Sequence, residues 1–111
     1  MLERYGVYWV NLDPVVGSEI AKTRPAVIIS DDAMNRLLRK VVVCPVTSRL
    51  HPRWPSRVQA RIGGQESEIA VDQIRTIDKV CVGAEIDRLD DETATKVRHI
   101  ITVMYGVLSV N

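Results

Sequence analysis

The chain has 111 residues, of which 46% are hydrophobic and 26% are charged, and its formal net charge is +1. This length suits one domain with a buried core, and the composition is ordinary for a globular protein. A membrane-spanning helix is not expected, since no apolar run in the sequence is long enough to cross a bilayer. The N-terminal stretch has no small-residue cleavage site typical of a signal peptide. We therefore expect a single domain over residues 1–111, located in the cytoplasm.

The cysteines and histidines give no sign of a metal site. Cys44 and Cys81 both lie in apolar, strand-like surroundings, which favours free thiols over a disulfide. Neither a CxxC motif nor a His/Cys ligand spacing is present. We expect no metal and no cofactor.

The small net charge hides an uneven distribution. Residues 36–61 contain seven Lys or Arg and no acid, whereas residues 62–95 contain nine acids against three bases. A basic segment in a nearly neutral chain suits a partner that carries phosphates. The alternative is that strand alternation scatters these charges over different faces.

The first half of the chain predicts three strands. The β-branched and aromatic stretch 6–12 predicts the first, which ends at Asp13-Pro14. A long connection over 15–23 leads to a second strand over 25–30. An N-cap at residues 30–32 predicts a short helix through about residue 38. The apolar run 40–47 predicts a third strand that is buried on both faces.

The second half predicts a hairpin, a further strand and a terminal helix. Gly63-Gly64 predicts a tight turn between strands over 57–62 and 67–71. A short strand near 80–86 follows. Apolar residues at helical spacing then predict an amphipathic helix, and they are Val97, Ile100, Ile101, Met104, Tyr105 and Leu108. Together these elements predict a mainly β domain with helices (α+β), of the small-barrel type.

Arg24 is the first candidate for chemistry. Because the residue before a proline is forced into an extended conformation, Pro25 should hold Arg24 at the mouth of the second strand. A planar guanidinium fits two phosphate oxygens and can stabilise charge that develops there. A hydroxyl such as that of Thr47 or Ser18 can donate to the same phosphate. The alternative is an ordinary surface arginine at a strand end.

Residues 48–57, SRLHPRWPSR, predict an ordered but irregular loop. Trp54 lies between Arg53 and Arg57, and such an aromatic can stack on single-stranded bases while the cations follow the backbone. It could equally cap the barrel. If the protein is a non-catalytic RNA-binding barrel, the salt dependence of its RNA binding should trace to Arg49, Arg53 and Arg57. His51 fits a solvated surface residue better than a proton-transfer group.

Three blocks in this order resemble the MazF/PemK family of toxin endoribonucleases, the mRNA interferases of type II toxin–antitoxin systems. They are GVYWVNLDPVVGSEIAKTRPAVIIS at 6–30, VVVCPVTS at 41–48 and AVDQIRTIDK at 70–79. The resemblance implies an SH3-like barrel with a C-terminal helix, the MazF/CcdB-like toxin fold, assembled as a homodimer. It also implies metal-independent cleavage of single-stranded RNA to 2′,3′-cyclic phosphate and 5′-hydroxyl ends, and inhibition by a cognate antitoxin.

The resemblance also assigns residues. In one branch of the family the catalytic pair falls on Arg24 and Thr47. A second branch uses a histidine, an arginine and an aspartate, where this chain has Ser18, Ala70 and Asp72, so the first branch fits. The expected RNA-binding residues are Ser18, Glu19, Lys22, Ser48, Arg49, Arg53, Trp54, Asp72 and Gln73. Arg75 and Asp78 are expected to fasten their segment structurally.

Two other functions remain open at this level. One is a toxin of the same fold that binds gyrase, as CcdB does through its terminal helix. The final residues VLSVN, which lack an aromatic, argue against this role. The other is a non-catalytic RNA-binding barrel.

Overall fold

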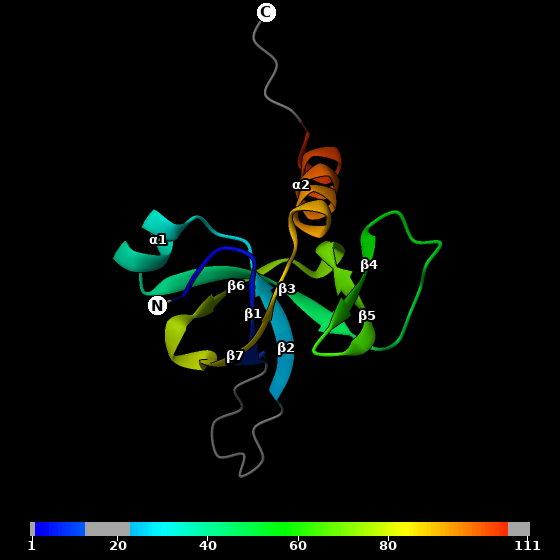
Figure 1. Cartoon of the computed structure of the whole chain (residues 1–111). Helices are drawn as coiled ribbons and strands as arrows, with labels where there is room; N and C mark the ends of the chain where they lie inside the picture. Colours follow the sequence, from blue (N-terminus) through cyan, green and yellow to red (C-terminus); the bar gives the residue numbers. More distant parts are fainter. Residues whose placement is uncertain (1, 13–22, 107–111) are drawn as a thin grey trace, which may run out of the picture.

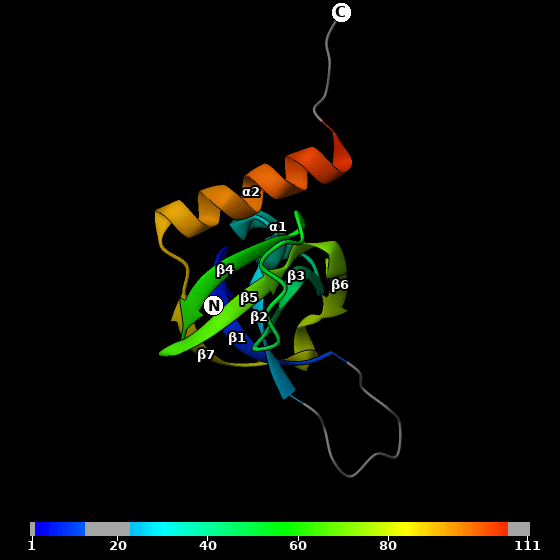
Figure 2. The same ribbon diagram turned by 90° about the vertical axis from the view of Figure 1, so that its right-hand side faces the viewer.

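The structure, a computed structural model, describes residues 2–12 and 23–106. Within them, seven strands form one curled sheet in the order β4-β5-β3-β2-β1-β7, with β6 paired to β3. The strands are β1 (Gly6–Asn11), β2 (Thr23–Ile28), β3 (Lys40–Thr47), β4 (Arg57–Ile62), β5 (Gln65–Ala70), β6 (Arg75–Asp78) and β7 (Val82–Arg88). The helices are α1 (Asp32–Leu37) and α2 (Asp91–Tyr105), with single 3-10 turns η1 (Val71–Gln73) and η2 (Lys79–Cys81). Figures 1 and 2 show α2 lying across one end of the half-barrel.

β3 organises the sheet because it changes partner along one edge. Its first half pairs with β6, from Lys40 to Val43, and its last two residues pair with β5. On its other edge it pairs with β2. Pro45 stands where the partner changes, which is where a central strand can tolerate a residue without an N–H. η1 connects β5 to β6 beside this point and so lies next to the end of β3.

The sheet buries side chains on both faces. One core joins the sheet to α2, and includes Val27, Cys44 and Val46 from the strands and Val97 from the helix. The second core lies on the opposite face, under the curl of β1, β2, β3 and β6. Alternation along each strand sends neighbouring residues to different faces, as expected for a pleated sheet. The prediction that β3 is buried on both faces is confirmed.

Local chemistry fixes the ends of the elements. Asp31 and Asp90 cap the two helices by accepting hydrogen bonds from Met34 N and Thr93 N. Gly63 and Gly64 both have positive φ, 58° and 79°, which is the turn that a two-residue hairpin loop requires. α2 ends at Gly106 with φ of 82°. Leu108, which the apolar spacing placed on the same helix, lies outside the described residues.

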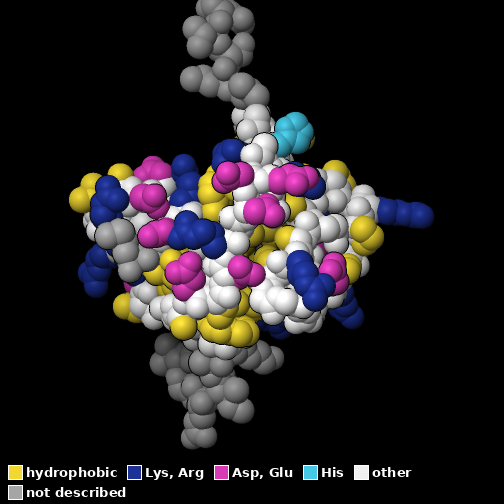
Figure 3. Space-filling model, viewed as in Figure 1, with side chains coloured by type: hydrophobic (Ala, Val, Ile, Leu, Met, Phe, Trp, Pro, Cys, Tyr) yellow, Lys and Arg dark blue, Asp and Glu magenta, His cyan; other side chains and the backbone are white. Residues whose placement is uncertain are grey.

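The prediction of a mainly β small barrel with a C-terminal helix is confirmed. Strand boundaries differ from the expected ones, because β2 begins at Thr23 and pairs with β1 from its first residue. The strand predicted over 80–86 is shifted, because residues 80 and 81 belong to η2 and β7 runs from Val82 to Arg88. β6 is an additional short strand. No helix in the described ranges is long and apolar enough to cross a membrane. In Figure 3, acidic and basic side chains are interspersed over the visible face.

Candidate functional site

A cleft of about 690 Å³ opens where β2 begins and β3 ends. It gathers seven of the predicted site residues, from four separate parts of the chain. They are Arg24, Thr47, Ser48, Arg49, Trp54, Asp72 and Gln73. Leu12, Pro45, Val46 and Ala70 supply apolar wall.

Arg24 and Thr47 enter the cleft from paired strands. The β2–β3 register ends at Ala26 opposite Pro45, and two further residues along each strand lead to Arg24 and Thr47. Arg24 is part of β2 and pairs with Val10 of β1, so its backbone is held in the sheet. Its side chain is exposed and makes no hydrogen bond or ion pair to the residues that the structure describes. Among the described residues, none competes with an anion for this guanidinium.

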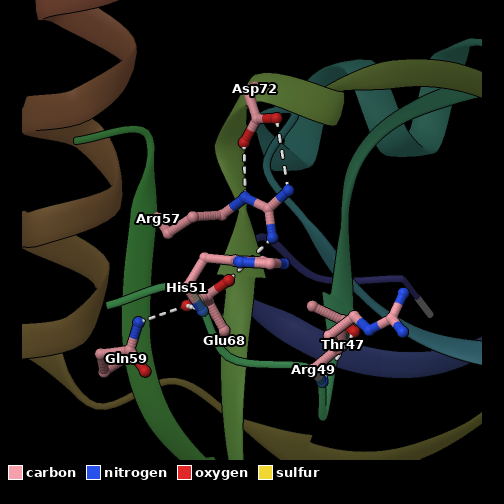
Figure 4. A network of polar contacts seen from close by, with 7 residues as sticks. All are labelled: Thr47, Arg49, His51, Arg57, Gln59, Glu68 and Asp72. Carbon is pink, nitrogen blue, oxygen red and sulfur yellow. Dashed lines mark hydrogen bonds and ion pairs between the residues drawn. The ribbon is translucent and has the colours of Figure 1, made fainter. Parts of the chain in front are cut away.

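The Thr47 hydroxyl is already oriented by the backbone. Its Oγ1 accepts a hydrogen bond from Arg49 N at 3.0 Å, as Figure 4 shows. This bond closes the turn at which the chain leaves β3. The hydroxyl hydrogen can still donate to a bound group. Ser48 and Arg49 follow immediately and are exposed.

η1 brings Asp72 and Gln73 to the opposite wall. The turn packs against β3 and buries Val71 completely. Its two polar residues, Asp72 and Gln73, line the cleft. Asp72 is tied to Arg57 by a 2.7 Å bond from Nε to Oδ1. Asp78 lies elsewhere, where it caps η2 and pairs with Lys40. Asp78 therefore has the structural role that was expected for it, which is to hold its own segment.

The Trp54 ring is stacked against two side chains of the protein itself. The His51 and Trp54 rings are nearly parallel, with centroids 3.9 Å apart. The Arg57 guanidinium carbon lies 4.6 Å from the centre of the same indole. Trp54 nevertheless stays 46% exposed, so part of it remains accessible at the cleft. His51, expected as a solvated surface residue, is half-buried and lines the cleft.

Arg57 is held between two carboxylates. Its Nη1 donates to Glu68 Oε2 at 2.7 Å, and its Nε donates to Asp72 (Figure 4). Burial would lower the pKa of Arg57, but hydrogen bonds and charges from Asp72 and Glu68 outweigh it and raise that pKa. Burial likewise opposes ionisation of Asp72, and the bonds from Arg57 and Ser56 still bring its pKa below the usual value. Arg57 therefore does not offer its charge to a phosphate, contrary to the expectation from its position in the basic segment.

Cys44 lies under the cleft and is unsuited to nucleophilic chemistry. Burial, with a further contribution from the negative charge of Asp72, raises the pKa of its thiol to about 12. Since the thiolate is the reactive form, this thiol stays inert near neutral pH. Both cysteines are free thiols. In the described ranges, no three His, Cys, Asp or Glu side chains are grouped as metal ligands would be.

Not every predicted residue reaches the cleft. Arg53 lines a smaller neighbouring hollow with Leu50, Pro52 and the His51–Trp54 pair. Ser18, Glu19 and Lys22 lie outside the described residues, as does the segment 107–111 on which the comparison with CcdB depends.

Sequence reasoning missed the buried Glu68. It lies between Ser67 and Ile69 in ESEIA, and no local pattern distinguishes it from the exposed Glu66. Only the polar side chains of the facing strand gave a hint, because a carboxylate opposite Gln59 and diagonal to Arg57 can find donors there.

Fold and cleft together define a small half-barrel protein in which strand ends and a loop place an arginine, a hydroxyl and an aromatic side chain around one cleft. Residues 3–105 match the family described as PemK-like, MazF-like toxin of type II toxin–antitoxin system. The chain belongs to this family, and the resemblance drawn from its three sequence blocks is confirmed.

Individual relatives are similar to this chain over nearly its whole length. The endoribonuclease EndoA of Bacillus subtilis is 34% identical over 97% of both chains. The endoribonuclease MazF of Staphylococcus saprophyticus is 32% identical, over 96% of this chain and 93% of its own length. The solved MazE–MazF structure from Deinococcus radiodurans (Form-III) superposes with a TM-score of 0.80 at 23% identity, covering 96% of this chain and 97% of that one. The last likeness concerns the fold alone.

Proposed function

We propose that this MazF-like toxin endoribonuclease cleaves single-stranded RNA at short sequences, without a metal ion, by attack of a 2′-hydroxyl on the neighbouring phosphate. The observation that carries the proposal is the approach of Arg24 and Thr47 to one cleft from paired strands. The remaining polar wall, from Ser48 and Arg49 on one side to Asp72 and Gln73 on the other, would hold the flanking nucleotides.

The reaction needs charge stabilisation more than it needs a protein nucleophile. The 2′-oxygen bonds to phosphorus while the bond from phosphorus to the 5′-oxygen breaks. The 2′-hydroxyl loses a proton, the 5′-oxygen gains one, and the products are a 2′,3′-cyclic phosphate and a 5′-hydroxyl. Arg24, permanently protonated, stabilises the extra charge on the phosphate oxygens, and Thr47 donates a second hydrogen bond.

Membership of the same family also supports a proposal for the assembly. We infer a cytoplasmic homodimer inhibited by a cognate antitoxin, with the chain acting as one domain. The relative from Deinococcus radiodurans was solved as a MazE–MazF complex, which supports an antitoxin partner.

The test is RNA cleavage in excess EDTA by the wild-type protein and by Arg24→Ala. Removing one donor to a developing oxyanion costs about 10²–10³-fold in rate, so the variant should lose at least that much. Product ends should be a cyclic phosphate and a 5′-hydroxyl. Arg36→Ala serves as the matched control, because Arg36 is exposed on α1 and away from the cleft.

Two results would overturn the proposal. Cleavage that needs added metal contradicts the chemistry, and full activity of Arg24→Ala contradicts the assigned residue. RNA binding without any cleavage by the wild-type protein would instead support a non-catalytic RNA-binding barrel.

A further inference from the structure

Glu68 is fully buried although it lies on the face of the β4–β5 hairpin that is turned away from the α2 core. The register pairs Gln59 with Glu68 and Arg61 with Glu66, so these side chains share one face. Val58 and Ile69, directly opposite each other, occupy the other face and pack in the core. Glu66 is accordingly exposed, at 73% of its side chain, whereas Glu68 is at 0%.

The loop over residues 48–56 accounts for part of this burial, because it is bonded directly to the Glu68 carboxylate. Glu68 Oε1 accepts from the backbone N of His51 at 2.6 Å and from Gln59 Nε2 at 2.5 Å. Its other oxygen, Oε2, accepts from Arg57 Nη1 at 2.7 Å (Figure 4). Both carboxylate oxygens are therefore used, and no buried polar side-chain atom among the described residues is left without a partner.

These bonds extend to the walls of the cleft on both sides. Through His51, Glu68 holds the loop whose two rings, His51 and Trp54, are stacked and line the cleft. Through Arg57 it reaches Asp72, because the same guanidinium donates to both carboxylates. The Arg57 guanidinium also lies against the Trp54 ring.

We propose that Glu68 is a positioning residue for RNA cleavage, which fixes the 48–56 loop and Asp72 as a rigid wall of the cleft. This inference rests on the proposed function and deepens it. Glu68 touches no reacting atom, since it is covered by the groups that it holds. It acts on how firmly and how selectively the flanking nucleotides are bound. Thr47 is its register partner on β3, but the Glu68 carboxylate bonds to His51 N, Gln59 and Arg57 and to neither Thr47 nor Arg24.

The primary test compares Glu68→Gln with Glu66→Gln. Both replace a carboxylate by its neutral isostere on the same face of β5, but only Glu68 contacts the loop. Displacing groups that orient a substrate costs up to about 10²-fold, so Glu68→Gln should lower kcat/KM by about 10–10²-fold. The loss should be mainly in KM, because the lost contacts bind ground state and transition state alike. Cut-site mapping on a long RNA should show a broader set of sites.

A second readout does not involve RNA. Limited trypsin digestion should cut Glu68→Gln faster than wild type at Arg49 and Arg53, which are exposed within the loop. Mass spectrometry identifies the sites. Arg57→Gln should give the same loop cleavage, and the double variant should lose less than the sum of the two single variants, because the two residues act through one contact.

The outcomes separate the alternatives. A fall in kcat at unchanged KM would indicate only a loss of folded enzyme and would overturn the positioning role. Unchanged trypsin cleavage, or equal effects of Glu66→Gln, would overturn it as well. If the wild-type protein cleaved no RNA, the proposed function would fail, and the positioning of the loop would stand or fall on the trypsin result.

Discussion

Thr47 is the residue at which the backbone turn and the proposed chemistry meet. Its Oγ1 accepts from Arg49 N, so the same hydroxyl that would donate to the phosphate also closes the turn. Thr47→Val keeps the shape of the side chain and removes both bonds. We expect single-turnover RNA cleavage to fall by about 10²-fold, as for one oxyanion donor.

Thr47→Ser is the matched control, because it keeps the hydroxyl and removes only a methyl group. It should retain most of the activity. Equal loss in both variants would mean that the methyl packing, and not the hydroxyl, is what matters at this position.

Arg24 and Arg57 show which residue roles a sequence can predict. Pro25 restricts Arg24 locally, so its extended conformation could be predicted, and the structure places it within β2. The partners of Arg57 lie 11 and 15 positions away and meet it only after the hairpin and η1 have formed. Its charge looked available for RNA because no local pattern reveals a distant carboxylate.

α2 is the element that closes the half-barrel, and its hold on the sheet is testable. Val97 is fully buried in the core shared with the strands. Val97→Ala should lower the free energy of unfolding by about 1.5–3 kcal/mol, from lost burial and the small cavity left behind. Urea unfolding at one protein concentration measures it.

Val80→Ala is the control, since Val80 is 86% exposed in η2. A surface substitution of this kind should stay within about 0.5 kcal/mol of wild type. Comparable losses in the two variants would contradict the assignment of Val97 to the core.

The β4–β5 hairpin should also show a defined response to acid. Burial alone would raise the pKa of Glu68, but the bonds from Gln59, His51 N and Arg57 outweigh it, so the pKa lies below its usual value. A lowered folded-state pKa means that this stabilisation is complete above the unfolded-state pKa of about 4.3 and is lost as the pH falls through the folded value. The stability difference between wild type and Glu68→Gln should therefore be constant from neutral pH to about pH 5 and shrink below it.

Urea unfolding of both proteins across this range is the measurement. A difference that stayed constant down to strong acid would show that Glu68 is not ionised in the folded protein.

At the level of elements, the sequence patterns predicted the helices and the hairpin turn better than they predicted which strands pair. The hairpin turn, the capped α1 and the amphipathic α2 follow from glycine, aspartate and apolar spacing. β6 and η1 were not predicted as separate elements, since both depend on β3 changing partner at Pro45. The cleft lies where β3 changes its pairing partner. Its lining residues were therefore predicted better from the family resemblance than from the spacing of apolar residues.

Across the whole molecule, only part of the positive charge is available to RNA. Arg57 is held by Glu68 and Asp72, Arg61 pairs with Glu66, and Lys40 pairs with Asp78. Arg49 and Arg53 are exposed beside the cleft and its neighbouring hollow, and neither side chain is in an ion pair with the described residues. Within the basic segment 36–61, the contribution to RNA binding should therefore come from these two arginines, in addition to Arg24 in the cleft.

Affinity for a non-cleavable, 2′-O-methylated RNA, measured over a range of salt concentrations, tests this. For single strands, the slope of log K against log salt changes by about 0.7 for each phosphate neutralised. Arg49→Ala and Arg53→Ala should each make the slope shallower by about that amount. Arg61→Ala should leave it unchanged, because Arg61 lines neither hollow and already faces a carboxylate. Equal effects of all three substitutions would mean that RNA responds to the summed field of the protein, and the assignment of its path to this cleft would be wrong.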